Sequence, residues 1–197
     1  MERLRAWQET LQATRMARWW RARPAPLRFA IRAAILMATF YGLLYYPYAE
    51  ISLPAHVLSA YLALVARASA SCLALFDASV HASGVYISGR SSLEIVLDCA
   101  ALDALALFGA TLLAFPTSIR MKALGLVAGT AVISGFNLLR IIILYVAAVR
   151  SPQTFEVLHE DVMALLMVFV SVGCFAAWAM LARNHSARAA THASSLV

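Results

Sequence analysis

The chain has 197 residues, of which 62% are hydrophobic and 13% are charged, and its formal net charge is +6. This composition is too apolar for a soluble domain and predicts an all-α polytopic membrane protein. All but one of the 16 basic residues are arginines, and positive-inside anchoring explains them more simply than nucleic-acid binding, which we do not expect. The three cysteines form no metal-binding spacing. We therefore expect no disulfide framework, no metal and no cofactor.

Residues 1–23 alternate arginines with apolar side chains such as Leu4, Trp7 and Trp19. This pattern is typical of a basic amphipathic helix that lies on a membrane surface. A secretory signal peptide is the alternative interpretation, but the basic region is too long and no small-residue cleavage site follows the next apolar run. We expect the segment to be retained.

The next two apolar runs differ in how well they suit a bilayer. Residues 27–46 end in Tyr45-Tyr46-Pro47-Tyr48, the aromatic residues expected at a membrane interface, and predict a first crossing from inside to outside. Residues 56–76 are ambiguous, because a charge at the centre, here Arg67, costs a spanning helix about 2.5–3.5 kcal/mol on insertion scales.

The distribution of charge predicts the topology. If the N-terminal arm, the turn near residue 120 and the C-terminal tail are cytoplasmic, 12 of the 16 basic residues lie inside, whereas eight of the ten acidic residues fall between residues 50 and 161. This arrangement follows the positive-inside rule and requires an odd number of crossings before residue 99. We therefore predict that residues 56–76 lie in the outer interface or re-enter the membrane. Residues 100–117, 122–148 and 160–182 then bring the total to about four spanning helices.

Three shorter features accompany these runs. Between residues 84 and 98, β-branched and aromatic residues flank the turn Ser88-Gly89-Arg90-Ser91, which predicts a small hairpin outside the membrane. Glycines at 125, 129 and 135 include one small-xxx-Gly pair suited to close helix packing. The last residues, 184–197, are rich in Ala, Ser and His and predict a disordered tail.

Three reactive side chains, Cys99, Arg140 and His159, interrupt the apolar sequence at the ends of consecutive runs. As a helix, the 20 residues from Arg120 to Arg140 span about 30 Å, which is about one hydrocarbon thickness. The chain should therefore return Arg140 to the level of Cys99. His159 follows a polar link, so we predict that all three side chains converge on one face of the membrane.

These residue types suit nucleophilic catalysis. The hairpin should deliver Cys99 to a helix start, where the helix dipole and a neighbouring cation would lower its pKa from about 8.5 toward about 3.5–7.5. His159 can take the thiol proton and return it to a leaving amine, and Arg140 can hold the substrate carbonyl or the tetrahedral oxyanion. Asn137 can orient Arg140 or bind substrate backbone, and Asp103 can orient His159 or Arg140.

At these residues the sequence resembles the exosortase/archaeosortase family, which are membrane-embedded cysteine transpeptidases. The resemblance covers about residues 93–178 and is carried by Cys99 after an extended run, by "FNLLRIIILY" around Arg140 and by "FEVLHEDV" around His159. It implies that Cys99 is the nucleophile, Arg140 a catalytic arginine and His159 the third catalytic residue. The chain departs from the family pattern after the cysteine, where many members have Cys-x-Gly and this chain has Cys99-Ala100-Ala101.

The resemblance also implies a protein-sorting function at the outer, periplasmic face of the inner or plasma membrane. The catalytic domain, residues 24–183, would act on membrane proteins that carry a C-terminal signal, made of a Pro-containing motif, a transmembrane helix and a basic tail. Cleavage would proceed through a thioester, and the acyl group would pass to an amine or hydroxyl acceptor. Two alternatives stay open, namely a purely hydrolytic cysteine protease and a noncatalytic helical scaffold or transporter.

Overall fold

The computed structural model of the protein describes residues 18–20, 22–49 and 51–194. Most of the predicted amphipathic segment, residues 1–17 and 21, lies outside these ranges. The described chain is mostly helical, and its long helices are α2 (Ala25–Leu44), α3 (Leu53–Ala74), α4 (Leu102–Ala114), α5 (Ile119–Arg150) and α7 (Met163–Ser194). A short helix, α6 (Pro152–Val157), and a π-helical turn, η2 (Leu158–Val162), connect α5 to α7.

Four helices in the described part of the chain are long and apolar enough to cross a membrane: α2, α3, α5 and residues Met163–Asn184 of α7. They confirm the predicted polytopic membrane fold. By contrast, α4 has 13 residues, and its length of about 20 Å is less than one hydrocarbon thickness. The predicted crossing over residues 100–117 is therefore a shorter helix, because the cysteine turn and Pro116 occupy its two ends.

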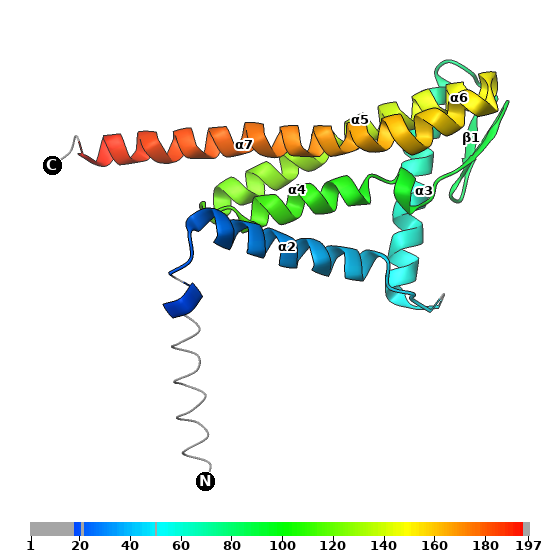
Figure 1. Ribbon diagram of the computed structural model, residues 1–197. Coiled ribbons are helices and arrows are strands. Elements are labelled where there is room, and N and C mark those ends of the chain that lie inside the picture. The colour runs from blue at the N-terminus through cyan, green and yellow to red at the C-terminus, as the bar shows by residue number, and fades with distance from the viewer. Residues whose placement is uncertain (1–17, 21, 50, 195–197) are drawn as a thin grey trace, which may run out of the picture.

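The direction of α3 separates it from the other long helices. Figure 1 shows α2, α4, α5 and α7 side by side, whereas α3 runs across one end of this bundle. Length and composition alone would let α3 span a membrane. If the parallel helices cross the bilayer, however, α3 lies along its surface, which is one of the two positions we predicted for residues 56–76. Its exposed Arg67 would then meet water or lipid headgroups rather than hydrocarbon.

Two glycines on α5 allow neighbouring helices to approach closely. A Cβ atom at Gly125 would overlap the Trp178 ring of α7, and one at Gly129 would overlap the Phe108 ring of α4. Trp178 Nε1 also donates a hydrogen bond to the backbone oxygen of Met121 at 3.1 Å. The predicted close packing is confirmed at these two glycines, whereas Gly135 has no such neighbour within 4 Å among the described residues.

Residues 81–94 form a small antiparallel sheet in the order β1 (His81–Ser83), β2 (Tyr86–Ser88) and β3 (Ser92–Glu94). Ile87 pairs with Leu93, and both side chains are buried against α3 and the C-terminal half of α5. The predicted hairpin is confirmed as β2 and β3. Strand β1 is additional, since its sequence lacks the β-branched and aromatic residues typical of strands.

The C-terminal tail differs from the prediction of disorder over residues 184–197. Helix α7 continues to Ser194, and residues 195–197 lie outside the described ranges. The reason is the high alanine content of this stretch, because alanine has the best intrinsic helix propensity.

Two hydrophobic clusters meet at the start of α4. The first joins the sheet to α3 and α5 and includes Cys99, and the second joins α4, α5 and α7 and includes Ala101. The turn that carries the cysteine therefore lies where the two clusters meet, packed on both sides.

Candidate active site

A short turn carries Cys99 from the sheet to α4. Residues Leu97–Cys99 form one 3-10 turn, and Ala101 follows in the left-handed conformation with a φ of 56°. Cys99 therefore precedes the first residue of α4, Leu102, by three positions and is not itself at the helix start. The thiol is buried, with only 2% of the residue exposed.

The backbone of this turn is held from two neighbouring helices. Three side chains each donate a hydrogen bond to one of the consecutive carbonyl groups of residues 98–100. The bonds run from Arg140 Nη1 to the Asp98 oxygen at 3.1 Å, from Asn137 Nδ2 to the Cys99 oxygen at 2.9 Å and from the Tyr61 hydroxyl to the Ala100 oxygen at 3.1 Å. Because every carbonyl around the thiol has a partner, the position of Cys99 is fixed by α5 and α3 together.

The structure brings His159 to Cys99. The distance from the Cys99 Sγ to the His159 Nε2 is 3.2 Å, within reach of direct proton transfer. His159 lies in η2, and the Phe155 ring stacks on its imidazole at a centroid distance of 5.4 Å. A π-helical turn inserts one residue into a helix and changes the direction of the side chains around it. In this structure the π-helical turn carries His159, whose imidazole faces the thiol.

The ionisation of Cys99 differs from the sequence-based expectation. Burial raises the pKa of the thiol above its ordinary value, although the positive charge of Arg140 acts in the opposite direction. The carboxylate of Asp98 raises the pKa further. The expected fall in pKa is therefore wrong for this structure, because Cys99 is enclosed and α4 begins beyond it. A neutral thiol requires a base, and His159 is the adjacent one.

Arg140 and Asn137 are buried polar residues with spare hydrogen-bonding capacity. They are 5% and 3% exposed, respectively. Within the described chain, Arg140 Nε and Asn137 Oδ1 have no hydrogen-bond partner. An unpaired buried polar atom costs about 1–3 kcal/mol, so a ligand that reached either atom would recover part of that cost. Arg140 lines the adjoining cavity, where such a ligand can lie.

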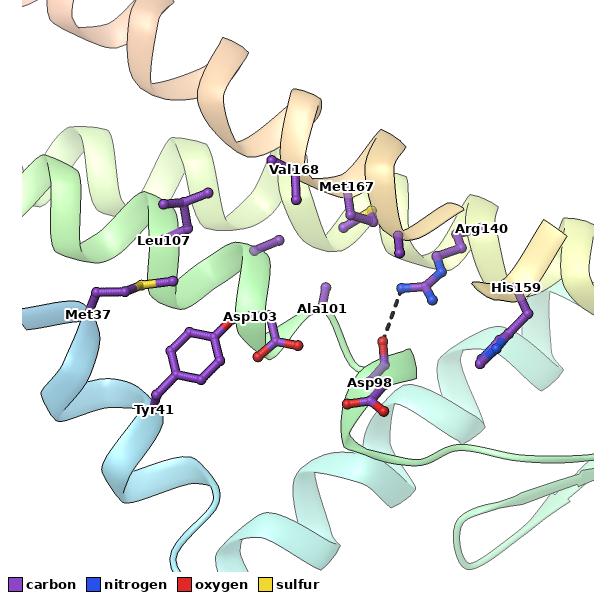
Figure 2. Close-up of a pocket in the computed structure, with 12 residues that line it drawn as sticks. Met37, Tyr41, Asp98, Ala101, Asp103, Leu107, Arg140, His159, Met167 and Val168 are labelled. Atoms are coloured by element: carbon purple, nitrogen blue, oxygen red, sulfur yellow. Dashed lines mark hydrogen bonds between the residues drawn. The ribbon is translucent and has the colours of Figure 1, made fainter. Parts of the chain in front are cut away.

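This cavity has a volume of about 510 Å³. Its wall comes from α2, from the turn before α4, and from α4, α5, η2 and α7. Figure 2 shows the side chains that line it, with a dashed line from Arg140 to the Asp98 backbone. The polar lining residues are Tyr41, Asp98, Asp103, Arg140 and His159, and the apolar ones are Met37, Ala101, Ala104, Leu107, Ala164, Met167 and Val168.

Asp103 has a different partner from the one predicted. The Tyr45 hydroxyl lies 3.1 Å from the Asp103 carboxylate and 3.2 Å from the Asp98 carboxylate, so the two acids share one donor. In the part of the chain that the structure describes, no hydrogen bond joins Asp103 to His159 or Arg140, although its charge acts on Arg140. Burial and the two carboxylates raise the pKa of Tyr45, which keeps it a donor. Asp103 therefore attaches the end of α2 to the site.

Sequence reasoning missed Tyr45 and Tyr61 as site residues. Tyr45 follows an apolar run and looks like an interfacial aromatic, and Tyr61 lies within the ambiguous run 56–76. Their roles depend on which helices pack beside the cysteine turn, and no local pattern carries that information. The described residues include no group of three or more His, Cys, Asp or Glu side chains placed to hold a metal ion.

A family model described as "Transmembrane exosortase (Exosortase_EpsH)" matches residues 14–178. The matched range includes the sheet, the cysteine turn, α5 and the π-helical turn with His159. No curated protein and no solved structure matches the chain.

Proposed function

Since the chain belongs to the transmembrane exosortase family, we propose that it is a sorting transpeptidase that uses Cys99 as its nucleophile. It would cleave the C-terminal signal of a membrane protein at the outer membrane face and transfer the new acyl end to a surface acceptor. The observation that carries this proposal is the 3.2 Å contact between the Cys99 thiol and the His159 imidazole, beside a cavity lined by Arg140.

In the first half of the reaction, His159 takes the proton of the Cys99 thiol, and the thiolate attacks the scissile carbonyl carbon. A carbon–sulfur bond forms, and the carbonyl oxygen becomes an oxyanion that the Arg140 guanidinium can hold. The carbon–nitrogen bond then breaks, and His159 returns its proton to the leaving amine. The product is a thioester on Cys99 and a released C-terminal segment.

In the second half, an amine or hydroxyl acceptor attacks the thioester. His159 removes the acceptor proton and delivers it to the departing sulfur, which restores the neutral thiol. If water is the acceptor, the same residues perform hydrolysis. The hydrolytic alternative therefore differs only in what reaches the thioester.

Asn137, Tyr61 and Asp103 act through other residues in this proposal. Asn137 and Tyr61 donate hydrogen bonds to the backbone carbonyls of Cys99 and Ala100. Asp103 accepts a hydrogen bond from Tyr45, which follows α2. Bond formation requires the sulfur within a few tenths of an ångström of a productive position, and supporting hydrogen bonds of this kind maintain such positions.

The test is co-expression with a membrane protein that bears a C-terminal sorting signal. Cys99→Ala should leave this substrate at full length while the enzyme still inserts into the membrane. Cys72→Ala and Cys174→Ala are matched controls and should process it normally, since these thiols lie in α3 and α7. Cleavage by Cys99→Ala would exclude thiol catalysis, and the mass of the new C-terminus would separate transfer from hydrolysis.

A further inference from the structure

The cavity beside Cys99 has a polar end and an apolar end. Figure 2 shows Met37 and Leu107 together at the end away from His159, with Asp103 and Tyr41 between them and Arg140. Met37 precedes Tyr45 by eight helical residues, about 12 Å along α2. If the Tyr45–Tyr48 segment marks the interface, the apolar end of the cavity lies at the level of the hydrocarbon.

Helices α2 and α7, which lie on either side of this cavity, diverge toward the end of the bundle that carries Cys99. Phe29 of α2 stacks on Phe175 of α7 at a centroid distance of 6.0 Å, so the helices meet near the start of α2. Figure 1 shows them diverging from there toward the end of the bundle that α3 crosses. Helix α2 packs on α4 yet has no buried residue. The cavity lies where these helices diverge, because Met37 and Tyr41 of α2 and Val168 of α7 line it, and Val168 is 46% exposed.

We propose that a membrane-embedded substrate enters this cavity sideways from the bilayer, between α2 and α7. The apolar helical segment that follows the cleaved bond lies against Met37, Leu107 and Val168, and the bond itself lies at the level of Cys99 and Arg140. This inference rests on the proposed function and identifies the surface that receives its substrate.

Packing against this surface has a specific physical cause. Lipid tails are as apolar as leucine, so helices associate within a bilayer through van der Waals packing and hydrogen bonds rather than through the hydrophobic effect. A cavity beside an apolar wall lacks contacts that a fitted side chain can supply. The unpaired Arg140 Nε at the polar end adds a donor for the carbonyl of the bond to be cleaved.

The opposite side of the cysteine turn is less suited to a substrate. A smaller cavity of about 170 Å³ lies there between α3 and α5, and its lining includes Tyr61, Leu64 and Asn137. The hydroxyl of Tyr61 and the amide of Asn137 are already bonded to backbone carbonyls of the turn, and Cys99 does not line this cavity among the described residues. His159 and Arg140 line the larger cavity instead.

Cysteine cross-linking to an uncleaved substrate tests the proposal. The full-length enzyme carries Cys72→Ala, Cys99→Ala and Cys174→Ala, and the co-expressed substrate carries one cysteine at successive positions after its cleavage site. Val168→Cys is compared with its neighbour Phe169→Cys, which is 65% exposed, and Leu64→Cys, 62% exposed, reports on the opposite side. We expect about tenfold more cross-linking from Val168→Cys than from either control. This ratio corresponds to a free-energy difference of about 1.4 kcal/mol between the two positions.

On the α2 side of the cavity, Met37→Cys should likewise give about tenfold more cross-linking to the substrate than its neighbour Ala38→Cys. Equal yields within each pair, a higher yield from Leu64→Cys, or cross-links only between two enzyme copies would overturn lateral entry. Processing of the same substrate by the unmodified enzyme is measured in parallel. Processing without preferential cross-linking would contradict the docking surface alone, and preferential cross-linking without processing would contradict the proposed function alone.

Discussion

Ala101 is the residue at which the cysteine turn has an unfavourable backbone conformation. Its φ of 56° lies in the left-handed region, which costs a residue with a Cβ atom about 1–2 kcal/mol. Side chains of α5 and α3 bind the carbonyls of residues 98–100, and Ala101 then joins this fixed turn to α4 as its N-cap. Many members of the family have glycine at this position, and glycine adopts positive φ without a steric penalty.

Ala101→Gly should therefore stabilise the protein, by up to about 1 kcal/mol after the entropic cost of glycine is included. For a chain of this size, such a gain raises the midpoint of thermal unfolding in detergent by up to about 4 °C. Ala100→Gly is the matched control, since Ala100 has a φ of −91°. The control should lower the midpoint, and a fall in both variants would contradict a strained Ala101.

Arg140 has two separable properties, its charge and its planar set of donors. Its charge lowers the pKa of Cys99 against the larger effect of burial, so the thiol should titrate above the usual value of about 8.5. The rate at which a small reagent alkylates Cys99 should accordingly rise with pH, and this rise should lie at a higher pH than for an ordinary thiol. Arg140→Leu removes the charge and should move this profile to still higher pH, whereas Arg140→Lys should leave it nearly unchanged.

Processing should separate the same two variants in another way. Lysine cannot reproduce the forked contact of a guanidinium, and removal of a positioned oxyanion donor typically costs about 10²–10³-fold in kcat. Arg140→Lys should therefore process slowly even though its alkylation profile is preserved. Near-parental processing by Arg140→Lys would limit Arg140 to an electrostatic effect, and processing by Arg140→Leu would remove it from the reaction.

The residues of the site were predictable to different degrees. Cys99, Arg140 and His159 stand out because reactive side chains are rare in apolar runs and lie at run ends here. The pKa of Cys99 was not predictable, because it depends on enclosure by the sheet and α3. The bond from Tyr61 to the turn was likewise hidden, because it joins residues 39 positions apart through tertiary packing.

At the scale of elements, α3 and α5 act together on one turn. Each supplies a side chain that binds a carbonyl beside the thiol, Tyr61 from α3 and Asn137 from α5. The hairpin, the long helices and the close glycine contacts followed from periodicity and residue type. The short α4, strand β1 and the helical tail did not, because their limits depend on neighbouring turns, sheet pairing and alanine propensity rather than on apolar run length.

Tyr61→Phe tests whether α3 positions Cys99, the proposed nucleophile. It removes one hydrogen bond worth about 1 kcal/mol and keeps the ring, so kcat should fall about fivefold with little change in KM. Tyr46→Phe is the control, since its ring packs on Tyr48 outside the site. A purely structural role would instead reduce the amount of folded enzyme in the membrane and leave the rate per folded molecule unchanged.

At the scale of the whole molecule, α5 is longer than a bilayer requires. Its 32 residues extend about 48 Å, whereas a hydrocarbon core is about 30 Å thick. The excess lies beyond Arg140, where Ile141 and Tyr145 pack with the sheet. If residues 119–140 cross the bilayer, the sheet, α6 and the cysteine turn all lie on one side of it. Positive charge on the opposite side predicts that this side is outside.

Accessibility labelling of single cysteines tests this topology in the enzyme with Cys72→Ala, Cys99→Ala and Cys174→Ala. Ser92→Cys in β3 and Gln153→Cys in α6 should react with a membrane-impermeant maleimide in intact cells. Ile119→Cys, at a position that is 76% exposed, should react only after permeabilisation. Labelling of Ile119→Cys in intact cells, with protection of Ser92→Cys, would invert the topology and the proposed outer site with it.

Cysteine labelling at the two ends of α3 tests directly whether this helix spans the bilayer. Ile51 precedes the helix and is 92% exposed, and Ser79 follows it in an exposed position. A helix that lies along the outer surface keeps both ends outside, so Ile51→Cys and Ser79→Cys should label together in intact cells. A helix that spans the bilayer would separate them. It would also place Arg67 in hydrocarbon, at a cost of about 2.5–3.5 kcal/mol, and add a crossing that reverses the positive-inside bias of everything after it. Labelling of only one of these two positions in intact cells would therefore show that α3 spans the bilayer and that an odd number of crossings before residue 99 is wrong.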